Sequence, residues 1–194
     1  MKVLKENYDG LQELKKLPQY LKSFLSLPSI KKLLEDYNFT VLYRAAYNYL
    51  DTIKIHRVTE LLNSLGIDPL DYLDYIPNDF LSHTQIKSVT IPNHIRGIGI
   101  FAFYDCSSLT SVAIPNSVTS IDNYAFCGCD SLTRVTIGSG VMRIGYKVFE
   151  SCYKLDDINY TDTKDQWSKI KLERGWNSES SIKTIHCIDG DIEL

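Results

Sequence analysis

Residues 86–109 read IKSVTIPNHIRGIGIFAFYDCSSL, and residues 109–132 read LTSVAIPNSVTSIDNYAFCGCDSL. Both stretches contain a Val-x-Ile segment, a Pro-Asn pair, an Ala-Phe pair and a Cys three residues before a Leu, and the matching positions are 23 residues apart. A fixed period of about 20–50 residues is typical of a solenoid, in which each repeat forms one coil of a stack. The sequence therefore predicts a solenoid.

The alternation within Val-x-Ile predicts one short strand per repeat, with two of its side chains turned inward. The Pro-Asn pair then ends the strand and turns the chain. The inward rows are Val89, Val112, Val135 and Ile158; Ile91, Ile114 and Ile137; Phe103, Phe126 and Phe149; and Cys106, Cys129 and Cys152. Because a single coil leaves most of this apolar surface uncovered, we expect stacking of the coils to bury it.

The strand, the Ile-Pro-Asn turn, the Ala-Phe pair and the Cys-x-Ser-Leu ending resemble the BspA-like leucine-rich repeat family. The resemblance implies a leucine-rich repeat domain over residues 75–194. It comprises a half-repeat at 75–88, repeats at 89–111, 112–134 and 135–157, and a C-terminal cap at 158–194. The third repeat departs from the pattern, because Gly138-Ser139 stands where the others have Pro-Asn.

The cap region predicts a helix followed by a strand. Thr163 is placed to cap a short helix that carries Trp167 and Ile170 on one face, and residues 182–188 then form a last strand. A helix and a strand at this position close the open end of the stack.

Residues 1–74 contain no trace of the repeat. Their apolar residues have helical spacing and predict four or five short helices, which form either a separate helical domain or an enlarged N-terminal cap. The predicted fold class is therefore α+β, an all-α segment followed by a short solenoid. Tyr43 and Tyr47 are four residues apart, share one helical face and are candidate partner-binding residues.

The formal net charge of −3 argues against general nucleic-acid binding, which usually requires a basic face. A helix-turn-helix reading of residues 40–65 fails for the same reason, because Arg57 is the one basic residue between 57 and 65. The chain has no apolar run long enough for a signal peptide or a membrane span. We therefore expect a cytoplasmic protein without a membrane partner, or a cell-surface protein if a leader was removed.

The five cysteines do not predict catalysis or metal binding. Three of them form an inward row, where a free thiol behaves as a small apolar group. Cys127 aligns with Tyr104 and Glu150 and is expected to be exposed. The ligand spacing of zinc sites is missing, and His186 and Cys187 point to opposite faces of a strand. Since no catalytic or phosphate-binding motif occurs either, we expect no enzyme, cofactor or metal site.

Two rows of side chains point outward from the predicted strands, next to the inward pairs. Their candidate partner-binding residues are Ser88, Ser111, Arg134 and Asp157 in one row, and Thr90, Thr136 and Asn159 in the other, which also contains Ala113. Four aromatic residues outside the inward pattern, Phe101, Tyr104, Tyr124 and Tyr146, fall at turns and are a second set of interface anchors. Either set predicts a surface for a protein partner. The alternative for the two strand rows is that their small polar residues only cover a face of the sheet.

The favoured function is a non-catalytic scaffold that binds a protein partner. Three alternatives stay open: an inhibitor from a phage or mobile element that occludes a host defence enzyme such as a CRISPR nuclease, a surface adhesin that lacks its leader, and an enzyme with an unrecognised site. The family resemblance implies adhesion. The small size, the solenoid surface and the lack of a catalytic motif favour the inhibitor.

Overall fold

A computed structural model of the chain describes residues 69–194. The predicted N-terminal helices up to residue 68, with the candidate residues Tyr43 and Tyr47, lie outside the described residues. A short 3₁₀-helix, η2 (Pro69–Tyr72), precedes the compact unit formed by Asp74–Leu194.

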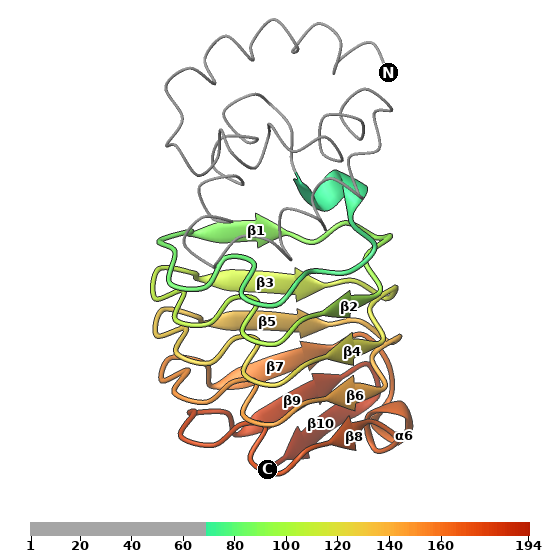
Figure 1. Ribbon diagram of the computed structural model, residues 1–194. Coiled ribbons are helices and arrows are strands. Elements are labelled where there is room, and N and C mark those ends of the chain that lie inside the picture. Colours follow the sequence, from blue (N-terminus) through green and yellow to red (C-terminus); the bar gives the residue numbers. More distant parts are fainter. Residues whose placement is uncertain (1–68) are drawn as a thin grey trace, which may run out of the picture. The chain divides into compact units, whose positions relative to one another are not determined.

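This unit is a β-solenoid of about four coils built from two sheets (Figure 1). The larger sheet has six strands in the order β1-β3-β5-β7-β9-β10, and the smaller has four in the order β2-β4-β6-β8. The strands of the larger sheet are β1 (Ser88–Thr90), β3 (Ser111–Ile114), β5 (Arg134–Ile137), β7 (Asp157–Tyr160), β9 (Thr184–Cys187) and β10 (Gly190–Glu193). Those of the smaller sheet are β2 (Gly97–Ile98), β4 (Ser120–Ile121), β6 (Arg143–Ile144) and β8 (Lys171–Leu172).

The strand register confirms the repeat that the sequence predicts. Val112 lies opposite both Val89 and Val135, so consecutive strands of the larger sheet pair in parallel with an offset of one 23-residue period. The smaller sheet repeats the offset, with Ile121 opposite Ile98 and Ile144. The apolar residues of this sheet recur in the sequence, but its strands were not predicted, because strands of two residues are too short to show an alternation.

The core contains a row of aromatic rings along the axis of the stack. The rings of Phe103 and Phe126 stack with centroids 5.0 Å apart, and those of Phe126 and Phe149 with centroids 5.7 Å apart. Trp176 continues the row edge-on, 6.2 Å from Phe149. All three phenylalanines are fully buried, so each coil depends on its neighbours to cover its largest side chain.

The turn that contains the Ala-Phe pair joins each coil to the next by backbone hydrogen bonds. The N–H of Phe103 donates to the carbonyl of Ala125 at 2.8 Å, and the N–H of Phe126 donates to that of Val148 at 3.0 Å. These bonds satisfy backbone groups that would otherwise be buried without partners, since the turn lies against the core. Stacking therefore supplies hydrogen bonds as well as apolar contacts.

The C-terminal cap contains the predicted helix and, besides the predicted strand, two strands that were not predicted, β8 and β10. Thr163 caps α6 (Lys164–Trp167), and its hydroxyl accepts a hydrogen bond from the N–H of Gln166. Both Trp167 and Ile170 are buried, but α6 ends at Trp167, so Ile170 follows the helix rather than lying on it as predicted. The expected last strand over 182–188 is the shorter β9, and β10 then pairs with it antiparallel after a tight turn. Gly190 follows that turn with φ of 119°, a conformation that other residues avoid.

Within residues 69–194, no helix is both long and apolar enough to cross a membrane.

Candidate functional site

The outward side chains of the six-stranded sheet form one continuous surface, called here the sheet face. The strand register places Ser88, Ser111 and Arg134 in one row, and Asp157 and Thr184 continue it. The second row follows the alternate positions of the same strands. It contains Thr90, Ala113, Thr136, Asn159 and His186. The seven candidate residues predicted on strands thus lie together on this face, and whether they bind a partner stays a prediction.

The chemistry of the sheet face changes from the first strand to the last. On β1 and β3 the outward residues are Ser, Thr and Ala, which are small and uncharged. From β5 onward the face carries Arg134, Asp157 and His186, and β10 adds Asp191 and Glu193. A partner that covers this face therefore meets a flat uncharged half and a charged half.

Arg134 begins β5, the third of the six strands, and is exposed on the sheet face. In its own row Arg134 lies between Ser111 on β3 and Asp157 on β7, and the nearby residues of the other row, Ala113 and Thr136, have short side chains. Among the residues that the structure describes, Arg134 has no ion-pair partner. The guanidinium carries five donors and forms no ion pair with the adjacent Asp157, so it is available to bind an external acceptor.

His186 bridges the last three strands of the face. Its Nδ1 lies 2.9 Å from Oδ1 of Asp191 on β10, and its Nε2 lies 3.7 Å from Oδ2 of Asp157 on β7. The hydrogen bond with Asp191, followed by the negative charges of both carboxylates, raises the pKa of His186. From the sequence, His186 was expected on the last strand of the cap, with no partner assigned to it. The Asp189-Gly190 pair, a common hairpin signal, marks the turn that brings Asp191 opposite it.

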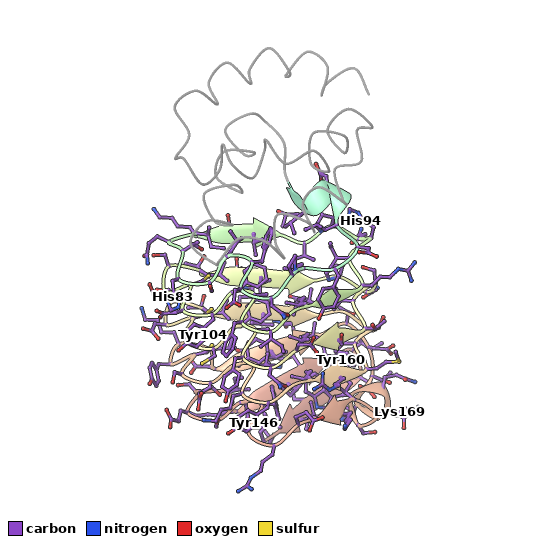
Figure 2. The ribbon with its side chains drawn as sticks, in the orientation of Figure 1. His83, His94, Tyr104, Tyr146, Tyr160 and Lys169 are labelled. Atoms are coloured by element: carbon purple, nitrogen blue, oxygen red, sulfur yellow. The ribbon has the colours of Figure 1, made fainter. Side chains whose placement is uncertain are left out.

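The aromatic residues predicted at the turns form a row along one edge of the stack. The rings of Phe101 and Tyr124 stack with centroids 5.0 Å apart, and Tyr124 meets Tyr146 edge-on at 5.4 Å. Tyr104 contacts both Phe101 and His83. Figure 2 labels His83, Tyr104 and Tyr146 of this row. Because each ring is packed against another, and Phe101, Tyr104 and Tyr124 are partly buried while His83 and Tyr146 are exposed, coil-to-coil packing accounts for the row.

The three cysteines of the inward row are structural. Their thiols donate to backbone carbonyls of the preceding coils: Cys106 to Leu81 at 3.1 Å, Cys129 to Phe103 at 3.3 Å and Cys152 to Phe126 at 3.2 Å. Burial raises the pKa of all three thiols, that of Cys152 to about 12. At neutral pH they are protonated, which makes them poor nucleophiles and poor metal ligands.

The expectation that Cys127 is exposed is wrong, since only 7 % of it is accessible. Its sulfur lies 3.6 Å from Oε2 of Glu150, the residue one repeat later. Glu150 is held in turn by an ion pair with Lys147, so the longer side chains of the next coil cover the short thiol. Burial, and then the negative charge of Glu150, raises the pKa of Cys127 to about 12.

Among residues 69–194, no group of three or more His, Cys, Asp and Glu side chains is placed to hold a metal ion. Cys187 is half-buried, and burial raises its pKa. The imidazole of the neighbouring His186 is engaged with two carboxylates rather than with this thiol. The pair therefore lacks the contact between nucleophile and base that catalysis by a cysteine requires.

The sequence model of the family described as BspA type leucine rich repeat region matches residues 73–187, in six copies. No curated protein matches the chain.

Three solved structures are similar to this chain. A leucine-rich repeat protein of Treponema pallidum has 24 % identity and a TM-score of 0.50, over 57 % of this chain and 50 % of its own. One from Bacteroides ovatus has 24 % identity and a TM-score of 0.49, over 59 % and 28 %. A leucine rich cell surface protein of Faecalibacterium prausnitzii has 27 % identity and a TM-score of 0.43, over 54 % and 34 %. The chain thus spans half or less of each protein, and the likeness concerns the fold.

Proposed function

Because the chain belongs to the BspA type leucine-rich repeat family, we propose that it is a non-catalytic scaffold that binds a protein partner through the sheet face. Solenoids present extended regular surfaces, and the side chains that point out from their strands are the ones a partner reaches. In this chain those side chains are short on β1 and β3, which leaves a flat surface for close contact.

The exposed position of Arg134, without an ion pair, is the observation on which this proposal rests. Arg134 is exposed on the third of the six strands, it lies between Ser111 and Asp157 in its row, and among the described residues it has no ion-pair partner. Arginine is enriched at the energetic centres of protein interfaces, because its planar donors bind carboxylates and its stem adds apolar contact. We therefore place the centre of the binding surface at β5 and expect the partner to offer an acidic group there.

Affinity purification of the full chain, followed by mass spectrometry, tests the proposal when three variants are run beside the wild type. Arg134→Glu reverses the central charge, and Thr136→Arg adds bulk beside it. Lys154→Glu is the matched control, since it reverses an exposed charge in a turn away from the sheet. A partner retained by the wild type and by Lys154→Glu, but lost with the two face variants, supports the proposal. A partner captured equally by all four chains, or none captured by the wild type, contradicts it.

The identity of the partner is the narrower part of the proposal. The sequence-based hypothesis of an inhibitor of a host defence enzyme is tested by assaying the captured partner. An enzyme whose activity falls as the wild-type chain is added, but not as Arg134→Glu is added, supports this role. A captured partner without enzymatic activity contradicts it and leaves the scaffold function in place.

A further inference from the structure

Side chains from three neighbouring strands at the C-terminal end of the larger sheet come together at the imidazole of His186. His186 lies on β9, Asp191 stands directly opposite it on the antiparallel strand β10, and Asp157 approaches from the parallel strand β7. Asp191 is within hydrogen-bond distance of Nδ1, at 2.9 Å, and Asp157 is 3.7 Å from Nε2. Figure 1 shows β10 as the last strand of this sheet, paired with β9.

Only the imidazolium form suits this arrangement fully. A neutral imidazole has one N–H, so it donates to one carboxylate and presents an acceptor nitrogen to the other, whereas the imidazolium donates from both nitrogens. The charged groups that face His186 from the adjacent strands are Asp157 on β7 and Asp191 on β10. Glu193 lies one row along β10, where it accepts from the hydroxyl of Thr184 at 3.4 Å. Without a proton on His186, no positive charge stands between Asp157 and Asp191, and the cation beside Asp157 in its own row is Arg134 on β5, on the side away from β10.

We propose that His186 forms a pH-sensitive contact that keeps β10 paired with the rest of the sheet. When protonated, it bonds to β10 through Asp191 and attracts β7 through Asp157, which holds the last strand in register. When neutral, it donates to one carboxylate at most and no longer carries the positive charge that offsets the two, so their repulsion favours the opening of the strand. Since β10 covers the edge of β9, its opening uncovers the backbone groups through which β9 pairs.

The direction of the pH effect follows from the sign of the shift. The pKa of His186 in the folded chain is raised above the value of about 6.5 that an unperturbed histidine shows. A group with a raised folded-state pKa contributes its stabilisation fully below the unfolded value and loses it as the pH rises through the folded value. β10 is therefore held in the sheet under acidic conditions, and its opening is favoured under alkaline conditions.

Hydrogen exchange of the backbone amides, measured on the full chain at about pH 5.5 and about pH 8.5 and corrected for intrinsic rates, tests this proposal. The reporter amides are those of β10 and of Leu194, whose N–H donates to the carbonyl of Lys183 at 2.9 Å. We expect their protection to fall by about two- to fivefold from acid to alkaline pH, the range that a cross-strand pair of opposite charges is worth. His186→Gln should remove this dependence on pH, whatever its effect on the overall level of protection.

A second histidine of the chain supplies the matched control. His83 also pairs with a carboxylate, that of Asp105, with 3.0 Å between Nδ1 and Oδ2, but in a turn rather than between strands. His83→Gln should leave the pH dependence of β10 unchanged. In addition, Asp191→Asn should lower the pKa of His186 in an NMR titration of its ring protons. Equal protection of β10 at both pH values in the wild type, or the same change in His186→Gln, overturns the proposal.

Discussion

The backbone oxygen of Asn116 occupies the space that a β-carbon on Gly140 would fill. The side-chain oxygen of the same asparagine accepts a hydrogen bond at 3.0 Å from the N–H of Ser139. Gly138, two residues before Gly140, likewise faces Asn116, whose backbone nitrogen is 2.6 Å from the position of a β-carbon at Gly138. Gly-Ser-Gly therefore replaces Pro-Asn-Ser in the third repeat because this turn passes close beneath the asparagine of the coil before it.

Substitution of Gly140 by alanine should accordingly destabilise the solenoid. The clash is with backbone, which cannot rotate away, so the coils must separate locally, and we expect the free energy of unfolding to fall by about 2 kcal/mol or more. Urea denaturation followed by circular dichroism measures the loss. Ser139→Ala, at the exposed residue between the two glycines, is the control and should change stability by less than about 0.5 kcal/mol. Equal stability of the two variants would mean that the turn can accommodate a β-carbon at residue 140, and would contradict the prediction.

The close approach at Gly140 is a contact between coils, and such contacts could not be predicted from the spacing of residues. The 23-residue period predicted the inward rows, the strand register and the outward rows, because all three follow from residue spacing alone. The burial of Cys127 was missed because it depends on the length of Glu150 in the next coil rather than on any spacing. The link between His186 and Asp191 was missed because it requires β10, and the strand predicted at 182–188 was expected to be the last one.

A related contact joins the second and third coils at the turn after the short strands. Oδ1 of Asn123 accepts from the N–H of Tyr146 at 2.9 Å. Asn123→Ala removes the acceptor and leaves this N–H to find water, which should cost about 1–2 kcal/mol of unfolding free energy. Asn123→Asp keeps an oxygen at the same position and should retain most of the stability. Chemical denaturation of both variants checks the prediction, and a loss as large in Asn123→Asp as in Asn123→Ala would refute it.

The reactivity of the thiols should follow their burial. Four of the five cysteines are buried, and burial raises the pKa of each, that of Cys127 and Cys152 to about 12, so almost none of their thiolate exists at pH 7. Cys187 is half-buried and should react alone with Ellman's reagent in the folded chain. All five should react once the chain is unfolded in urea. Mass spectrometry after brief alkylation identifies the labelled residue, and early labelling of the inward row would contradict the structure.

Glu173 should make stability depend on pH at the acidic end. It bonds to Nζ of Lys171 at 2.9 Å and lies 3.5 Å from Nε of Arg143, whose Nη1 also binds Asp122 at 2.7 Å. The hydrogen bond from Lys171, and then the charges of Lys171 and Arg143, lowers the pKa of Glu173. A group with a lowered folded-state pKa stabilises the fold above its unfolded value, about 4.3 for glutamate, and loses this effect as the pH falls through the folded value.

Glu173→Gln should therefore unfold at a lower temperature than the wild type at pH 7, and the difference should close as the pH approaches about 3. Thermal unfolding at a series of pH values, followed by circular dichroism, measures this convergence. Asp165→Asn is the control, because Asp165 pairs with Lys169 within one turn of the cap but is 74 % exposed. Ion pairs that are this exposed contribute little to stability, so the melting temperature of Asp165→Asn should match that of the wild type at every pH. A gap for Glu173→Gln that persists undiminished at pH 3 would show that the carboxylate acts through packing rather than through its charge.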